Sequence, residues 1–167
     1  MVILDLQRVN AEAPYKVMPT VREGYFRFTT DFGVDYIIGF SQEELLDYEE
    51  TYQFAIINAN HQKSPRDRKL RDTVVAFVYE FFAQSDRVML YFCETGDERQ
   101  SLRSRLFEWW FKSSHRSEVF FSGSAVIPDE DGTLNYVTYI TRQDNPNLVR
   151  ISNEFAMTVQ VLRQKPE

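Results

Sequence analysis

The chain has 167 residues, of which 43% are hydrophobic and 26% are charged. These proportions are typical of one globular domain and exclude an intrinsically disordered chain, a collagen-like chain and a small disulfide-rich protein. With 19 basic and 25 acidic side chains the net charge is −6, so nucleic acid and anionic lipid repel the chain on average, and nucleic acid is not an expected partner.

Cysteine content and hydropathy predict a cytoplasmic location. The only cysteine is Cys93, which cannot form an internal disulfide. The residues before Pro14 include Asp5, Arg8 and Glu12, where a secretory leader has a long apolar run. No apolar stretch approaches the ~20 residues needed to span a bilayer, so we expect no membrane insertion.

The first predicted elements are two strands of a β-hairpin. Residues 24–30 and 34–40 alternate in polarity on either side of a short connection that contains Asp31 and Gly33. Alternation of this kind around a turn that contains glycine is the pattern of an antiparallel hairpin.

Residues 41–50 begin with Ser41 and Glu44 in the spacing of a capping box, which predicts a short helix or a helical loop. Residues 52–58 are rich in aromatic and branched apolar side chains and predict a third strand.

A long helix is predicted next. Ser64, Pro65 at the first helical position, and Asp67 three residues after the serine form a helix start. Apolar residues then recur at intervals of three and four through to about Gln84. They are Leu70, Val74, Phe77, Val78, Phe81 and Phe82.

Residues 87–93 form a nearly continuous apolar run, which predicts an interior strand covered on both faces. A second helix is expected to begin at Thr95, which has Glu98 in capping-box spacing, and to end near Ser113.

The last part of the chain predicts a hairpin and a helix. Residues 118–127 and 133–142 have strand character, and the Pro, Asp and Gly residues of 128–132 predict the turn between them. Asn145 as the cap and Pro146 as the first residue predict a C-terminal helix. Its apolar face consists of Leu148, Ile151, Phe155, Val159 and Leu162.

The predicted order is β-β-β-α-β-α-β-β-α, which indicates one α+β domain with a mixed sheet. The two strand–helix–strand units predict parallel strands, because such crossovers join strands that run in the same direction. The domain spans residues 1–167, with 1–23 as an N-terminal extension and 143–167 as the C-terminal helix.

The succession of elements over residues 24–142 resembles the GNAT-type N-acetyltransferase fold. The resemblance implies that the pyrophosphate of acetyl-CoA, or of another CoA ester, binds at the start of the first central helix. The matching stretch, residues 61–69, contains no glycine to admit the phosphates. Phe107 matches the position where these enzymes often have a proton-donating tyrosine. Both departures indicate a degenerate member.

The string from Tyr25 to Tyr36, followed by residues 91–94 and 97–100, resembles a small bacterial family without an assigned activity, found mainly in Bacteroidetes. The same resemblance includes Arg103, Leu106, Phe107 and Trp109. It implies a bacterial origin and supplies no mechanism.

Positive charge gathers in the middle of the chain, where residues 61–116 hold 11 basic and 8 acidic side chains. Lys63, Arg66, Arg68 and Lys69 surround the predicted start of the long helix, where cations oppose the helix dipole. An anionic ligand would explain them. Alternatively, they are solvated or pair with the acidic residues of 43–50.

A second candidate site follows the strand at 87–93. Arg99 and Arg103 are four residues apart and share a helix face, so both guanidinium groups can grip one carboxylate or phosphate. Alternatively, their acidic neighbours pair with them in a structural network. Glu94 is a candidate general base, as the GNAT resemblance implies for an acidic residue near this position.

The leading hypothesis is therefore a degenerate GNAT-like domain that binds an anionic small molecule or a protein partner at its basic helix starts. The alternative is a divergent acyl-CoA-dependent N-acyltransferase, in which Lys63, Arg66 and Arg68 hold the pyrophosphate and Glu94 is the base. The spacing of His and Cys residues predicts no metal site. Oligomeric state is not predicted.

Overall fold

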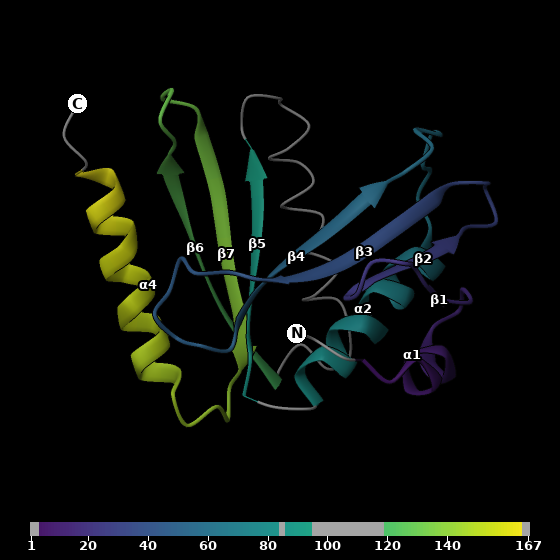
Figure 1. The fold of residues 1–167 in the computed structure, drawn as a ribbon, viewed down its shortest axis with the longest axis horizontal. Helices are drawn as coiled ribbons and strands as arrows, with labels where there is room; N and C mark the ends of the chain where they lie inside the picture. Colours follow the sequence, from purple (N-terminus) through teal and green to yellow (C-terminus); the bar gives the residue numbers. More distant parts are fainter. Residues whose placement is uncertain (1–3, 84–85, 95–118, 165–167) are drawn as a thin grey trace. The chain divides into compact units, whose positions relative to one another are not determined.

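The computed structural model describes residues 4–83, 86–94 and 119–164. The described residues form three helices and seven strands, an α+β composition (Figure 1). The helices are α1 (Leu6–Glu12), α2 (Arg68–Ala83) and α4 (Leu148–Arg163). The strands are β1 (Met18–Pro19), β2 (Tyr25–Thr29), β3 (Asp35–Gln42), β4 (Thr51–Asn58), β5 (Val88–Glu94), β6 (Phe120–Pro128) and β7 (Leu134–Arg142).

The strands follow the order β1-β2-β3-β4-β5-β7-β6 in one mixed sheet. β2 is antiparallel to β3, and β7 is antiparallel to both β5 and β6. β5 and β6 therefore run in the same direction, as the strand–helix–strand pattern predicts. They are not neighbours, however, because β7 lies between them. The interior position expected of residues 87–93 is confirmed, since β5 lies between β4 and β7.

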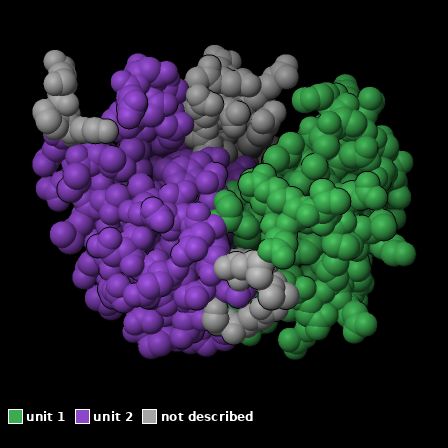
Figure 2. All heavy atoms as spheres, viewed as in Figure 1, with its two compact units in different colours: residues 1–41, 54–85 green, residues 42–53, 86–167 purple. Residues whose placement is uncertain are grey.

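The chain divides into two compact units (Figure 2). Unit 1 comprises residues 1–41 and 54–85, and unit 2 comprises residues 42–53 and 86–167. Strand β4 supplies its first three residues to unit 2 and the rest to unit 1. In the described part of the chain, no helix is long and apolar enough to cross a membrane.

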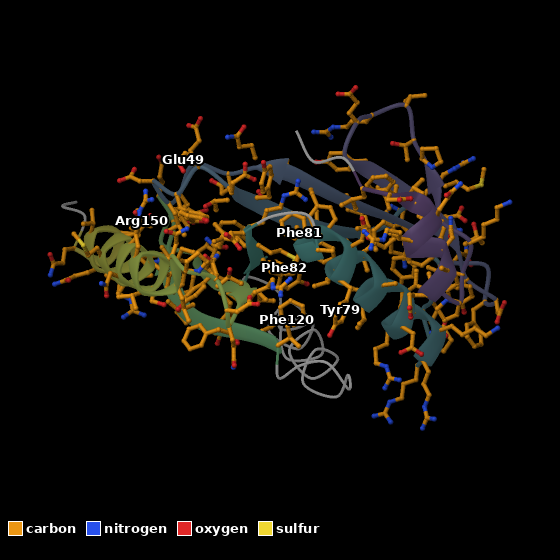
Figure 3. The ribbon with its side chains drawn as sticks, turned by 90° about the horizontal axis from the view of Figure 1, so that it is seen from below. Glu49, Tyr79, Phe81, Phe82, Phe120 and Arg150 are labelled. Carbon is orange, nitrogen blue, oxygen red and sulfur yellow. The ribbon has the colours of Figure 1, made fainter. Side chains whose placement is uncertain are left out.

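The core of unit 1 is aromatic. The apolar face predicted for the long helix is buried throughout α2. Phe81 on this face stacks on Phe40 of β3 with ring centroids 4.6 Å apart, and it meets Phe82 edge-on at 4.9 Å. Figure 3 labels Phe81 and Phe82 on α2. Because aromatic pairs of this geometry add to the free energy of burial, the Phe40–Phe81 pair helps to fix α2 against β3.

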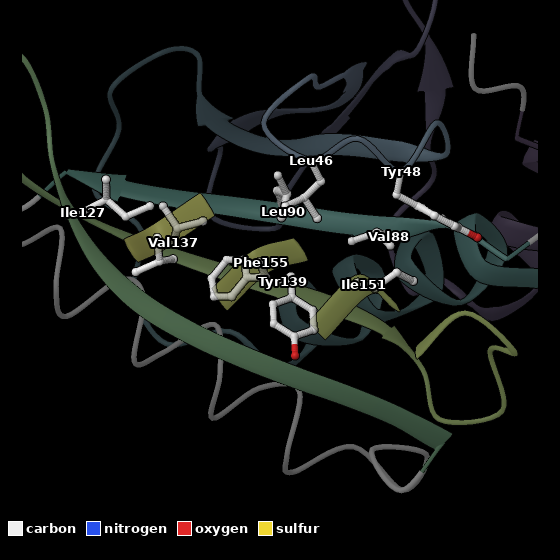
Figure 4. Packing of buried hydrophobic residues seen from close by; sticks show 10 residues of the cluster. Leu46, Tyr48, Val88, Leu90, Ile127, Val137, Tyr139, Ile151 and Phe155 are labelled. Carbon is white, nitrogen blue, oxygen red and sulfur yellow. The ribbon is translucent and has the colours of Figure 1, made fainter. Parts of the chain in front are cut away.

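The core of unit 2 packs α4 against its strands (Figure 4). Phe155 of α4 meets Tyr139 of β7 with ring centroids 4.6 Å apart. The expected C-terminal stripe is confirmed for four of its five residues: Ile151, Phe155 and Val159 are buried in this cluster, and Leu162 packs against it, whereas Leu148 is half-buried outside it.

Of the two conformations expected for residues 41–50, the short helix is wrong. Ser41, its expected cap, belongs to β3. The segment forms a loop in which the Glu43 side chain accepts hydrogen bonds from the backbone N–H groups of Glu44 and Leu45, at 3.1 and 3.2 Å. Leu46 and Tyr48 in this loop are buried in the core of unit 2. Burial of these two side chains decides the conformation, because a short polar helix contributes little on its own.

The expected helix starts are each displaced by two or three residues. α2 begins at Arg68 rather than at Pro65, and α4 begins at Leu148 rather than at Pro146. Asn145 nevertheless holds the approach to α4, since its side-chain oxygen accepts from the Asn147 N–H group at 2.8 Å.

The N-terminal extension contains structure that the sequence did not predict. α1 is capped by Asp5, whose carboxylate accepts from the Gln7 and Arg8 N–H groups. Val9, Tyr15 and Val17 are buried in unit 1.

Each unit has one glycine that faces a tyrosine on the neighbouring strand. Gly39 of β3 pairs with Tyr25 of β2, and Gly123 of β6 pairs with Tyr139 of β7. A Cβ atom on Gly39 would clash with the Tyr25 ring, and one on Gly123 would lie 2.5 Å from the Tyr139 ring. The two rings therefore occupy the space above the glycines.

Candidate functional site

The site that the structure describes most fully is the basic segment, defined as Lys63–Lys69. Residues 59–67 join β4 to α2 without regular secondary structure. Their start is fixed to the β2–β3 turn, because Ala59 N–H donates to the Asp35 carbonyl at 2.7 Å and Asn60 Nδ2 donates to the Gly33 carbonyl at 2.9 Å. The Asp35 N–H group returns a hydrogen bond to Asn60 Oδ1 at 3.1 Å. The approach to the basic segment is thus held by several hydrogen bonds.

The other end of the basic segment is held by Tyr15. Its hydroxyl donates to Asp67 Oδ2 at 2.5 Å and accepts from the Asp31 N–H group at 3.3 Å. Lys69 forms an ion pair with the same turn residue, with Nζ 2.8 Å from Asp31 Oδ2. The hydrogen bond that Lys69 Nζ donates to the Asp31 carboxylate raises the pKa of Lys69.

Three stacked aromatic rings contact the basic segment through two tyrosine hydroxyl groups. Tyr15 and Phe28 stack with centroids 6.0 Å apart, and Phe28 and Tyr36 at 5.7 Å. The Tyr36 hydroxyl donates to Ser64 Oγ at 2.6 Å. Two buried tyrosines thus use their hydroxyl groups to hold Ser64 and Asp67, the residues between which Arg66 lies.

Three of the four predicted cations in the basic segment are available. Lys63, Arg66 and Arg68 are exposed, and none of their side chains forms an ion pair or hydrogen bond with a residue that the structure describes. Lys69 is the exception because of its pair with Asp31.

The described basic side chains of unit 2, unlike these three, all have partners. Each described one is engaged: Arg87 with Glu50, Arg142 with Asp144, Arg150 with Glu154, and Arg163 with the Val126 carbonyl. Figure 3 labels Arg150, which also lies over the Tyr48 ring at 5.4 Å. Among the described residues, cations without a partner are therefore found in unit 1, where Lys16 and Arg27 are exposed and unpaired as well.

The start of α2 is already occupied by a carboxylate. Asp67 Oδ1 accepts from the Lys69 N–H group at 2.9 Å, and the Asp67 carbonyl accepts from the Arg71 N–H group at 3.3 Å. Since Asp67 caps the helix, a ligand anion would be held chiefly by the side chains of the basic segment.

The tyrosine at this site is not poised for proton transfer near neutral pH. Burial, followed by the hydrogen bond to Asp67, raises the pKa of Tyr15 to about 12. Its hydroxyl therefore remains a donor, and the arrangement favours binding over general acid–base chemistry.

The second predicted site lies mostly outside the described residues. Glu94 is the last residue of β5, opposite Asn135 of β7, and the structure does not describe its side chain. Arg99, Arg103 and the helix expected over residues 95–113 fall outside the described ranges. Among described residues, no three His, Cys, Asp or Glu side chains gather in a group that could hold a metal ion.

Sequence reasoning missed the residues that position the basic segment. Tyr15, Tyr36 and Asn60 act across 52, 28 and 27 residues, and no local pattern signals such contacts. It also missed Phe32, which is 53% exposed in the β2–β3 turn. An aromatic residue between Asp31 and Gly33 in a predicted turn is a signal that could have found it.

Comparison with models of protein families identifies the family of the chain. Residues 66–157 match the model of DUF6169, a family of unknown function. The chain belongs to the DUF6169 family. The match begins within the basic segment, at Arg66, and ends within α4, so it covers α2 and the β5–β7 strands. This confirms that the chain is a member of an uncharacterised family. No curated protein is similar to the chain.

Proposed function

We propose that this DUF6169 protein binds an anionic small molecule, with phosphate or clustered carboxylate groups, at the basic segment. The observation that carries the proposal is that Lys63, Arg66 and Arg68 are exposed, without described partners, on a stretch of chain held at both ends. Arg68 lies in the first turn of α2, where a cation opposes the helix dipole. A bound anion would offset this cost. An acidic surface on a protein partner would use the same cations.

A GNAT-like, single-domain fold in the bacterial cytoplasm is part of the proposal. The succession β2, β3, β4, α2 and β5, with the later β6–β7 hairpin, supports the GNAT resemblance. The same order favours a second candidate, an acyl-CoA-dependent N-acyltransferase in which Lys63, Arg66 and Arg68 hold the CoA pyrophosphate and Glu94 is the base. The helix start capped by Asp67 favours the degenerate, binding form.

The test is calorimetric titration with inorganic pyrophosphate and with acetyl-CoA, at low salt. The double variant Arg66→Gln/Arg68→Gln removes two cations of the basic segment. Its control is Lys16→Gln/Arg27→Gln, which removes two exposed cations of the same unit and the same net charge. We expect pyrophosphate binding that weakens with added salt, is lost in the first variant and is kept in the control.

A thermal unfolding series gives a second measurement. At a hundredfold excess over its dissociation constant, the ligand should add about 2.7 kcal/mol to the free energy of unfolding. Equal loss of binding in both double variants would show that net charge, and not this segment, is responsible. Tight binding of acetyl-CoA with acyl transfer to an amine would support the acyltransferase candidate. Absence of any effect of either anion at millimolar concentration would overturn the proposal.

A further inference from the structure

Phe32 is the most exposed aromatic side chain described in either unit. It is 53% exposed at the tip of the β2–β3 turn, whereas Phe26 and Phe28 on β2 are buried. A large exposed apolar ring is unfavourable in water, and its exposure is typical of a contact surface for a ligand.

The turn that carries Phe32 is well fixed. Thr30 Oγ1 accepts hydrogen bonds from the Phe32 and Val34 N–H groups, each at 3.2 Å. Gly33 N–H donates to the Thr30 carbonyl at 3.0 Å, and Gly33 has a φ of 74°, in the left-handed region that glycine adopts without strain. The Phe32 backbone is therefore ordered before any ligand binds, which lowers the entropy cost of binding.

The residues on either side of Phe32 contact residues at the two ends of the stretch that carries the free cations. Gly33 receives the hydrogen bond from Asn60, which precedes the basic segment. Asp31 forms the ion pair with Lys69, at the end of that segment. The β2–β3 turn, with its exposed aromatic ring, therefore contacts unit 1 residues at both ends of the stretch that carries the exposed cations.

The carboxylates on this surface are already engaged. Asp31 pairs with Lys69, and Asp67 accepts from Tyr15 and from the Lys69 N–H group. Because both are bound to donors, their repulsion of an incoming phosphate is reduced, while Lys63, Arg66 and Arg68 remain unengaged.

We infer that the ligand of the basic segment is a nucleotide, whose phosphates contact Lys63, Arg66 and Arg68 and whose base stacks on Phe32. The inference rests on the proposed anion-binding function and adds the aromatic part of the ligand. Any nucleotide base can stack on an aromatic ring, because stacking uses the flat face of the base and requires no hydrogen bond. The net charge of −6 favours a mononucleotide over a polynucleotide, because a long polyanion would also meet the acidic remainder of the chain.

The experiment compares ATP with inorganic tripolyphosphate, which has the phosphates without the base. Dissociation constants of both are measured by calorimetry for the unaltered protein, for Phe32→Ala and for Phe32→Trp. Phe121→Ala is the control, since Phe121 is another partly exposed phenylalanine, in β6. We expect ATP to bind about tenfold more tightly than tripolyphosphate, the equivalent of about 1.4 kcal/mol of stacking.

Phe32→Ala should abolish this difference and leave tripolyphosphate binding unchanged, while Phe32→Trp and Phe121→Ala should preserve it. If ATP and tripolyphosphate bind equally, or if Phe32→Ala keeps the preference, the nucleotide inference is wrong and anion binding stands. If neither compound binds at millimolar concentration, the anion-binding proposal fails with it. Circular dichroism of Phe32→Ala shows that the variant is folded.

Discussion

The Tyr15 hydroxyl donates a hydrogen bond to the Asp67 carboxylate across 52 residues of sequence. Tyr15 is 5% exposed, so this hydrogen bond joins a buried ring to a carboxylate side chain. Replacing Tyr15 by Phe should lower the free energy of unfolding by about 2 kcal/mol, because hydrogen bonds to charged groups contribute more than neutral ones. Urea unfolding of Tyr15→Phe measures the change. Tyr25→Phe is the control, since the hydroxyl of Tyr25 has no described hydrogen bond, and an equal loss in both variants would contradict the prediction.

The same contact predicts a loss of stability in alkali. The pKa of Tyr15 is raised from 10.0 to about 12, so between these values the native state keeps a proton that the unfolded state releases. The stabilisation is fully present below pH 10 and is lost as the pH rises through 12, by about 2.7 kcal/mol at most. Urea unfolding at intervals of pH checks this. Tyr15→Phe should lose less stability over this interval than the unaltered protein, and parallel curves would rule Tyr15 out as the source.

The core of unit 2 should depend strongly on Phe155. Phe155 is 6% exposed and meets the Tyr139 ring, so Phe155→Ala removes a buried ring and leaves a cavity. We expect a loss of about 3–5 kcal/mol in the free energy of unfolding. Met157 lies two residues away on α4 and is 65% exposed, so Met157→Ala should change it by less than about 0.5 kcal/mol. Similar losses in the two variants would show that α4 does not pack as described.

Gly123 should not tolerate a larger side chain. Gly123→Ala places a methyl group against the Tyr139 ring and should lower the free energy of unfolding by about 1–3 kcal/mol. The combined variant Gly123→Ala/Tyr139→Ala tests the cause, because removal of the ring removes the clash. Its loss should be smaller than the sum of the two single losses, and strict additivity would place the cost of alanine elsewhere.

Much of the fold could be predicted because its signals are local. Alternation of polarity located β2 and β3, and the spacing of apolar residues located α2 and α4. The start of α2 could not be located in this way. Ser64, the expected cap, is instead bound by Tyr36 from 28 residues away, and the cap is Asp67. Tertiary contacts of this kind can outweigh a helix cap, because a cap contributes only about 1 kcal/mol of stability.

The candidate site likewise has features that are local in sequence and could be predicted, and long-range features that could not. Its cations could be predicted because charge is a property of the residue itself, and Lys63, Arg66 and Arg68 are exposed as expected. Which of them have partners could not be predicted, because the pairing of Lys69 with Asp31 spans 38 residues. The hydrogen bonds that fix the basic segment are equally long in range, so only the structure shows that the segment is held at both ends.

The two glycine–tyrosine pairs have a consequence for the divergence of this family. A substitution at Gly39 or Gly123 collides with the ring opposite, so a relative can accept it only after Tyr25 or Tyr139 has become smaller. In each hairpin the glycine and the tyrosine should therefore evolve together as a coupled pair. Related sequences should keep both members of a pair or lose both, and the two pairs should vary independently because one lies in each unit.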